Sequence, residues 1–380
     1  MVSPMQVSHA YDDFSRRVYC ILGIPIDAIT MDDLCLQIYE ASITRQRLFI
    51  STPNLNFVML SQRDRDFRRS LLESDVCPAD GIGVILICKL LGIPTVSRVA
   101  GSDIPAALQA ASPRHLVRPL TVAFMGGDPG VGQRACEAVN NGPGNRLRCV
   151  AAIDPGMMTT EKMGDPALVA EINATGADFL IAALGAQKGQ TWLLTHLQAL
   201  TVPIVSHLGA TLNFLAGTVK RAPPLVQCLG LEWLWRIKEE PHLLPRYLSD
   251  GRAVLGLLFI RILPLACWLR WNRVDHESPG CSAQVVPDGA GGSKIIIKGA
   301  ASDNQLAVVE DAFRSAATHH SSIVLDVSGL HFFAMGFAGM ILMLEKNTQR
   351  QNQPLAIEGG SIGVMRALKG CGLGHLLVST

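Results

Sequence analysis

The sequence is poor in charged residues and has no metal-binding or disulfide framework. Only 17% of its 380 residues are charged, and the formal net charge is +1. This balance excludes the strongly basic surface typical of a nucleic-acid-binding protein. Ten cysteines are scattered without a single CxxC pair, so their spacing predicts neither a zinc site nor a disulfide scaffold. Their mostly apolar surroundings favour buried thiols in a reducing compartment.

The N-terminal region lacks the pattern of a secretory signal. Residues 1–17 are polar, and no apolar run of signal-peptide type follows them. We therefore expect the main body of the protein in the cytoplasm. Apolar residues, in contrast, make up 48% of the chain, and the mean hydropathy is +0.27. That value is high for a wholly soluble enzyme and indicates a localised membrane-contacting segment.

Residues 18–217 alternate short apolar runs with helix-like stretches, which predicts an α/β domain built on a parallel sheet. Ligands of such sheets bind beyond the carboxyl ends of the strands. The predicted strands are 47–51, 120–125, 148–152, 179–183 and 203–207. Between them the pattern predicts helices at 31–44, 65–73, 131–140 and 191–200.

Residues 218–273 form a basic, Trp-rich appendage with nine Lys or Arg against four acids. Its apolar run 254–269 is shorter than a membrane span and is interrupted by an Arg and a Pro. We expect an element that lies in the membrane interface. The alternative is a buried pair of core helices with an ordinary basic face. The residues expected to contact the membrane are Trp233, Trp235, Arg236, Arg246, Arg252 and Arg261.

The remainder of the chain is predicted to be a linker at 274–293, rich in Gly, Pro and Ser, and a small α/β domain at 294–380. The order expected in this domain is strand, helix, strand, helix, strand, helix, at 294–297, 304–318, 322–327, 338–350, 355–358 and 362–370.

Five motifs occur in order over residues 20–255. They are TPNLN at 52–56, ADGIG at 79–83 with RVAGSD at 98–103, FMGGDPG at 124–130, ALGAQK at 183–188, and FLAGTVKRAP at 214–223 with LGLEW at 229–233. Together they resemble the WecG/TagA/CpsF family of glycosyltransferases. A Rossmann oxidoreductase is disfavoured because the glycine-rich string is not GxGxxG.

The resemblance implies transfer of a sugar from a UDP-sugar to a polyprenyl-diphosphate-linked sugar, with inversion and without a metal or other cofactor. It also implies a modified Rossmann-like domain whose appendage meets the membrane. The protein would then be peripheral at the inner face of the bacterial cell membrane. In the family the products are teichoic-acid linkage units, enterobacterial common antigen or exopolysaccharide repeats. A second copy of the chain would compete with the membrane for the same apolar surface.

Asp80 is the expected general base, because the resemblance assigns that role to the Asp of the DG motif. An Asp before Gly is alternatively only a turn former. Thr52 ends a strand at the expected ligand edge and is the second candidate catalytic residue. The residues expected to bind substrate are Asn54, Asn56, Gly81, Arg98, Asp103, Gly126, Gly127, Gly130, Gly185, Lys188, Gly209, Lys220 and Arg221.

These binding roles have physical reasons and simpler alternatives. The turn at 126–130 starts a helix whose backbone N–H groups suit a diphosphate. Lys220 and Arg221 would stabilise the leaving diphosphate in place of a metal, or contact lipid phosphates. Arg98 pairs either with the diphosphate or with Asp103, which alternatively caps a helix. A DxD string at 64–66 lies in a charged helical stretch, where a solvated face is favoured.

The chain departs from the family pattern at four positions near the expected donor site. Where the family string reads GxPKQExW, this chain has Gln187, Gly189 and Gln190 in place of the Pro, Gln and Glu. At the fourth position, Asn213 replaces an Asp that is usual in the family. These departures motivate a second hypothesis, in which a degenerate transferase domain serves as a membrane-recruited scaffold that binds protein partners.

The C-terminal unit resembles a STAS domain, on the string IVLDVSGLHF at 323–332 and the helix after it. In that family a phosphorylatable Ser follows, and this chain has Met335 there. Methionine cannot accept a phosphate, so we expect a packing or partner-docking module rather than a phosphorylation switch.

Overall fold

The computed structural model describes most of the chain. The described residues are 12–94, 97–110, 118–156, 164–220, 222–223, 226, 232–239, 244–272, 280–289, 291–319 and 321–378, with the side chains of 233, 236, 239 and 246–250 left out.

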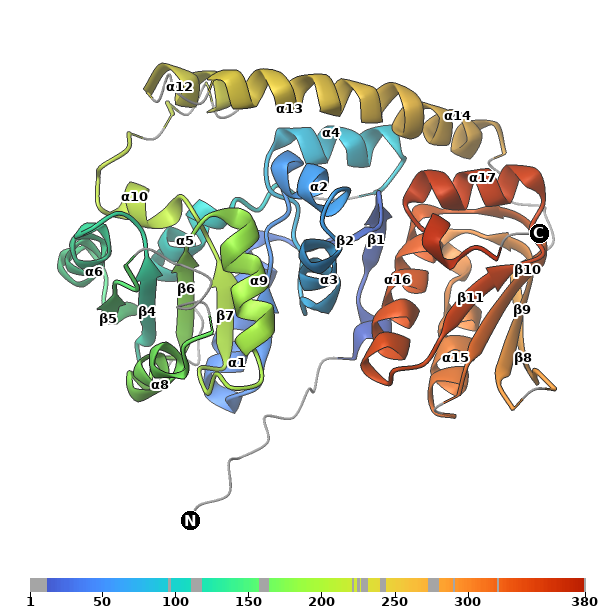
Figure 1. The fold of residues 1–380 in the computed structure, drawn as a ribbon, viewed down its shortest axis with the longest axis horizontal. Coiled ribbons are helices and arrows are strands. Elements are labelled where there is room, and N and C mark those ends of the chain that lie inside the picture. Colours follow the sequence, from blue (N-terminus) through green and yellow to red (C-terminus); the bar gives the residue numbers. More distant parts are fainter. Residues whose placement is uncertain are drawn as a thin grey trace, which may run out of the picture.

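The N-terminal part is built on a five-stranded parallel sheet in the order β3-β7-β6-β4-β5. Its strands are almost fully buried except at the β5 edge, as expected for a sheet with helices on both faces. Helices α1, α5 and α6 contribute to the apolar cluster on one face, and α8 and α9 to the cluster on the other (Figure 1). The strands are β3 (Leu48–Ile50), β4 (Leu120–Gly126), β5 (Leu147–Ile153), β6 (Phe179–Ala183) and β7 (Ile204–His207).

The helices of this part follow the strands that they connect. They are α1 (Met31–Thr44), α2 (Leu55–Ser61), α3 (Arg65–Glu73), α4 (Ile82–Leu90), α5 (Ile104–Ala110), α6 (Val131–Asn141), α8 (Pro166–Ala174), α9 (Ala186–His196) and α10 (Thr211–Leu215), with short 3-10 turns η1 (Asp13–Ser15) and η2 (Gly101–Asp103).

The C-terminal domain is a four-stranded sheet in the order β11-β10-β9-β8, covered by helices. Its elements are β8 (Ser282–Pro287), β9 (Ser293–Ala301), η5 (Asp303–Gln305), α15 (Ala307–Ala317), β10 (Ile323–Phe333), α16 (Met335–Arg350), β11 (Leu355–Glu358), α17 (Ile362–Cys371) and η6 (Gly374–Leu376). The prediction of a linker over 274–293 is wrong for β8, which pairs antiparallel with β9.

A hairpin that the sequence analysis missed joins the two domains. Strands β1 (Val18–Ile21) and β2 (Ile24–Asp27) pair with each other, and β1 packs on α16. A Cβ at Gly339 of α16 would lie 2.0 Å from the Val18 carbonyl oxygen, so only glycine permits this close approach. One continuous hydrophobic core therefore includes the hairpin, α2, α3, α4 and the C-terminal domain.

Buried ion pairs reinforce this contact. The Lys346 side chain on α16 is fully buried, and its Nζ lies 2.7 Å from Asp13 Oδ1. Arg68 on α3 donates two hydrogen bonds to the Glu345 carboxylate, at 3.0 and 2.8 Å. His375 Nε2 lies 2.8 Å from the same carboxylate. The C-terminal domain is therefore bound to the transferase part by apolar and ionic contacts together.

The appendage is α12 (Glu232–Glu239) and a second helix that runs without a break through α13 (Leu244–Leu257), the π-helical turn η4 (Leu258–Ile262) and α14 (Leu263–Trp271). Residues 251–271 are long and apolar enough to cross a membrane by length and composition, so the prediction that the run is too short is wrong. This helix lies along the protein, with α13 on α2 and α14 on α17 (Figure 1).

The sequence predictions of fold class and of most elements are confirmed. Helices 31–44 and 65–73 and strands 179–183 and 355–358 have the predicted bounds. The helix predicted at 191–200 instead begins at Ala186. The structure pairs Cys136 of α6 with Cys149 of β5 in a disulfide, although no pairing was predicted. Among the described cysteines this is the one crosslink, and it joins neighbouring elements.

We expect Glu345→Gln to lower the free energy of unfolding at pH 7 by about 3 kcal/mol, because it leaves the guanidinium of Arg68 without its buried counter-charge. Urea unfolding measures the change. Glu310→Gln is the matched control, since Glu310 pairs with Arg314 at the surface and such pairs contribute under about 1 kcal/mol. Equal effects of the two substitutions would contradict the role of the buried pair.

The same variant tests a pH dependence. Burial opposes ionisation of Glu345, but hydrogen bonds from His375 and Arg68 and the charge of Arg68 outweigh it and lower the pKa to about 2. The stabilisation is thus fully present above the ordinary pKa of 4.5 and is lost as the pH falls toward 2. The stability difference between the native protein and Glu345→Gln should narrow over that range. A difference that stays constant would sink this assignment.

Candidate active site

The two candidate catalytic residues meet at one glycine at the carboxyl edge of the sheet. Thr52 lies two residues after the end of β3. Asp80 follows a segment that runs beside β3, where Val76 forms a parallel β-bridge with Ile50. A Cβ at Gly101 would lie 2.8 Å from Thr52 Oγ1. The Gly101 N–H donates to Asp80 Oδ2 at 3.4 Å. The sequence predicted Thr52 at the ligand edge and Asp80 from its motif alone, and it could not show that the two residues share a neighbour.

The loop that carries Asp80 is fixed by backbone hydrogen bonds. The Asp80 N–H donates to the Pro53 carbonyl at 2.9 Å, and the Val99 N–H donates to the Ala79 carbonyl at 2.9 Å. Gly81 follows with a φ of 82°, and a Cβ there would meet nothing within 4 Å. Asp80 is partly exposed, whereas Thr52 is only 4% exposed. The carboxylate is therefore the more accessible of the two groups.

Arg98 links this edge to the appendage. Its Nη1 lies 2.7 Å from Glu232 Oε1 on α12, and its Nη2 lies 4.0 Å from Asp103 Oδ2. The predicted pairing with Asp103 is thus present at long range. The pairing with Glu232 was not predicted. All three side chains are partly exposed, so a charged ligand can reach the guanidinium.

The glycine-rich turn after β4 forms a hollow at the start of α6. Gly126, Gly127 and Gly130 have positive φ values of 89°, 85° and 78°. The Gly127 N–H already donates to the Ala183 carbonyl at 2.8 Å, so it is not free for a phosphate. The start of α6 has no side-chain cap. The hollow is lined by Gly126, Asp128, Gly130, Gly132, Gln133, Ala152, Ile153 and Asp154.

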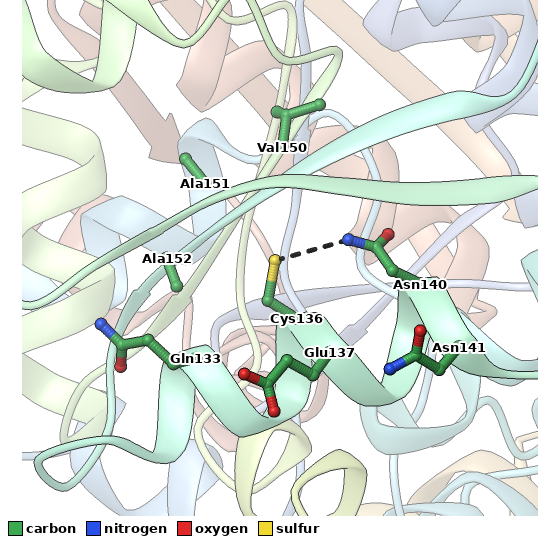
Figure 2. A pocket seen from close by; sticks show the side chains of 8 residues that line it. All are labelled: Gln133, Cys136, Glu137, Asn140, Asn141, Val150, Ala151 and Ala152. Atoms are coloured by element: carbon green, nitrogen blue, oxygen red, sulfur yellow. Dashed lines mark hydrogen bonds between the residues drawn. The ribbon is translucent and has the colours of Figure 1, made fainter.

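A larger groove of about 480 Å³ adjoins this hollow and shares Gln133 and Ala152 with it. Figure 2 shows the side chains of α6 and β5 that line it, with the amide of Asn140 directed at Cys136. The other lining residues are Glu137, Asn141, Val150 and Ala151. The groove lies at the β5 edge of the sheet, whereas Asp80 lies beyond β3 at the other edge.

The departures from the family string have structural partners in this chain. Gln187 donates to Asp64 Oδ2 at 2.5 Å, and Gln190 donates to the Ser51 hydroxyl. A Cβ at Gly189 would lie 2.2 Å from His207 Cδ2, so the imidazole fills the space that a larger residue would need. Asp64 caps α3 by accepting from the Asp66 and Phe67 N–H groups, and it also accepts from Gln187, so the first carboxylate of the DxD string is engaged in local contacts.

His207 holds the turn after β6. Burial lowers the pKa of its imidazole, so the ring is neutral, and its Nε2 lies 2.6 Å from the Leu184 carbonyl oxygen. The predicted ligand turn 185–188 is the first turn of α9, with Gly185 and Lys188 exposed.

The remaining predicted binding residues are spread along the same edge. The Asn54 side chain caps α2 by accepting from the Phe57 N–H at 3.2 Å, and Asn56 lies in the first turn of that helix. Gly209 is exposed after β7, and Lys220 is exposed after α10. Arg221 lies outside the described residues.

The predicted membrane residues divide into three groups. Arg252 is exposed, as expected. Arg261 instead donates to Gln62 Oε1 at 2.6 Å and to the Lys369 carbonyl at 2.9 Å, so its side chain is directed at the protein. The Trp235 indole donates to the Lys220 carbonyl at 3.1 Å. The side chains of Trp233, Arg236 and Arg246 lie outside the described ones.

In the part of the chain that the structure describes, no group of three or more His, Cys, Asp or Glu side chains could hold a metal ion.

The fold and the strand-end site define a class of parallel-sheet α/β proteins that bind ligands at the carboxyl edge. The chain belongs to the glycosyl transferase WecG/TagA/CpsF family, whose model matches residues 19–266. A second model, the STAS domain of the Mlab type, matches residues 289–379.

Two curated relatives carry the name N-acetylglucosaminyldiphosphoundecaprenol N-acetyl-beta-D-mannosaminyltransferase. The Staphylococcus aureus protein is 26% identical over 219 residues, which is 57% of this chain and 82% of that protein. The Bacillus spizizenii protein is 26% identical over 211 residues, which is 55% of this chain and 78% of that protein.

Sequence reasoning gave no role to Glu232, Gly101 or His207. Glu232 lies inside the LGLEW motif at 229–233. Its contact with Arg98 spans 134 residues of sequence, so no local pattern indicates it. Gly101 lies within the RVAGSD string at 98–103. A glycine just before a helix can indicate that another residue packs closely against the backbone there, and this signal was available in the sequence. His207 is detectable only in combination with Gly189, across α9 and β7.

We expect Gly101→Ala to lower the rate of sugar transfer by about 100-fold, because the added methyl group displaces the Thr52 hydroxyl and disturbs the hydrogen bond to Asp80. Steady-state kinetics and urea unfolding together measure the effect. Gly280→Ala is the control, since its Cβ would be 3.7 Å from the nearest atom. A Gly101→Ala protein with an unaltered rate would refute this arrangement of the site.

Proposed function

We propose that the protein is an inverting glycosyltransferase that moves a sugar from a UDP-sugar to a polyprenyl-diphosphate-linked acceptor. The reaction would serve the synthesis of cell-surface polysaccharide at the inner face of the bacterial cell membrane. The observation that carries the proposal is the convergence of Thr52 and Asp80 on Gly101, at the ligand edge of a chain from this family. The names of the two relatives support a polyprenyl-diphosphate-linked acceptor.

The layout of the sheet supports an extended donor. Thr52 follows β3 and the glycine-rich hollow follows β4, with β7 and β6 between them. Three strand spacings amount to about 14 Å. A nucleoside diphosphate sugar laid along this edge would place its sugar near Asp80 and its nucleoside near α6. Arg98, partly exposed beside the Asp80 loop, and the exposed Lys220 are the cations proposed to meet the diphosphate.

The proposed chemistry is a single displacement. The Asp80 carboxylate takes the proton of the acceptor hydroxyl, and the hydroxyl oxygen attacks the anomeric carbon of the donor. The bond from that carbon to the diphosphate oxygen breaks, and UDP leaves with the electron pair. Attack from the face opposite the leaving group inverts the anomeric configuration. The cationic side chains Arg98 and Lys220 would stabilise the negative charge that develops on UDP.

The appendage would bring the lipid-linked acceptor to the site. Its helix buries Ile262, Leu265 and Leu269 against the protein and exposes Phe259 and Ile260 at 65% and 76%. A helix with one side packed on protein and an exposed apolar side suits the membrane interface better than a span through the bilayer. The Arg98–Glu232 pair would connect this membrane contact to the reaction edge.

We expect Asp80→Asn to lower the rate of transfer between 100- and 10,000-fold, because the amide cannot accept the proton of the acceptor hydroxyl. The assay is UDP release together with mass spectrometry of the lipid product, using a panel of UDP-sugars and an N-acetylglucosaminyl polyprenyl diphosphate. Asp311→Asn, on the exposed face of α15, is the control. An unchanged transfer rate in a folded Asp80→Asn protein would refute the assignment of Asp80 as the general base.

The panel also tests the scaffold alternative. A native protein that binds none of the UDP-sugars and releases no UDP with the lipid acceptor would favour a degenerate transferase. Donor binding with product formation would exclude it and would identify the sugar.

We expect transfer to continue at an unchanged rate in the presence of a chelator, because Arg98 and Lys220 would supply the positive charge that a metal supplies in other transferases. Titration of the assay with EDTA measures this. A rate that is lost in EDTA and restored by Mg²⁺ would contradict metal independence, and Lys220→Met, which removes one cation, should slow the metal-free reaction.

A further inference from the structure

We propose that the C-terminal domain itself binds an anionic membrane surface, through helix α17. The surface concerned is named here the α17 stripe and consists of Ile362, Arg366 and Lys369. The proposal rests on the proposed membrane contact of α13 and α14, and it adds a second contact made by the other domain.

The α17 helix is fixed beside the appendage by close packing. A Cβ at Gly370 would lie 3.6 Å from Leu265 Cβ, and a Cβ at Gly363 would lie 3.2 Å from the Trp268 indole nitrogen. The Trp268 ring also stacks on Phe332 of β10, with centroids 5.9 Å apart. Figure 1 shows α14 and α17 side by side where the appendage, which runs along one side of the molecule, reaches the C-terminal domain. The two helices therefore present one rigid surface.

The α17 stripe borders this seam and is open. Residues 362, 366 and 369 are spaced by four and three positions, so they line up along one side of the helix. Gly363, Ala367 and Gly370 form the line of α17 that faces α14. Each residue of the stripe comes one position before a residue of that line, so the stripe is rotated from it by about 100° around the helix axis. Ile362 is 74% exposed, and Arg366 and Lys369 are both exposed. Neither basic side chain forms an ion pair with a described residue.

The charge of the combined surface favours lipid over other occupants. Neither α17 nor residues 251–271 contain a single Asp or Glu, and the same holds for α4, which lies under α13 (Figure 1). Exposed basic groups of these helices include Lys89, Arg252 and Arg270. Exposed apolar groups alternate with them, among them Ile260 at 76% and Trp271 at 85%. Basic and apolar side chains without acids are the composition of an interfacial contact with anionic lipid.

The test is binding of the full chain to phosphatidylcholine vesicles with and without about one third phosphatidylglycerol. A basic side chain near an anionic surface contributes a factor of about five, so Arg366→Gln/Lys369→Gln should bind the anionic vesicles about 25-fold more weakly. The matched control is Arg148→Gln/Lys298→Gln, which removes two exposed cations from β5 and β9. Phe259→Ser/Ile260→Ser reports on the appendage alone.

The outcomes separate the two proposals. Weaker binding by the α17 variant, with the control unchanged, supports the inference. Loss only in the Phe259→Ser/Ile260→Ser protein overturns the inference and keeps the membrane contact of the appendage. Equal loss in the α17 variant and the control also overturns it, because the effect would then be net charge alone. Binding unaffected in every variant overturns both proposals. Urea unfolding confirms that each variant is folded.

Discussion

The arrangement of the whole molecule depends on the contact between the β1–β2 hairpin and helix α16. The backbones of Gly339 and Val18 touch there, and the buried Lys346 ammonium is bound between acids of the N-terminal part. Such a contact tolerates little change, since a larger side chain or a missing charge leaves a clash or an uncompensated carboxylate. The STAS-like domain thus shares a hydrophobic core with the hairpin and with helices α2, α3 and α4 of the transferase part, and one face of α16 is occupied within the chain.

This union of the domains sets the orientation of the appendage. Helix α14 packs on α17, and Arg261 connects Gln62 of the N-terminal part with the carbonyl of Lys369 in the C-terminal domain. Because the helix is bound on both sides, its exposed apolar side has a fixed direction relative to the reaction edge. Burying the charge of Arg261 in lipid would cost free energy, whereas in this position its side chain forms hydrogen bonds to both domains.

The sequence predicted the parts that local patterns determine. Apolar runs located the sheet strands and α1, and the motifs picked out Thr52 at the ligand edge and Asp80 in its DG string. Contacts between distant segments were beyond local patterns. The hairpin of β1 and β2 was missed, and Glu232 was given no role because its partner Arg98 lies 134 residues away. The inward direction of Arg261 depends on Gln62, 199 residues away.

The donor-site departures illustrate the same limit and bear on activity. Read alone, Gln187, Gly189 and Gln190 indicate erosion of a family string, but each contacts a residue elsewhere in the fold. Gly189 in particular accommodates the His207 ring, whose Nε2 lies within hydrogen-bonding distance of the carbonyl that precedes the exposed Gly185. Two polar atoms of this cluster, Gln190 Oε1 and His207 Nδ1, are buried without a hydrogen-bond partner among the described residues. The three departing residues are therefore integrated into the packing of the strand edge, with Gly189 leaving the space that the His207 ring occupies.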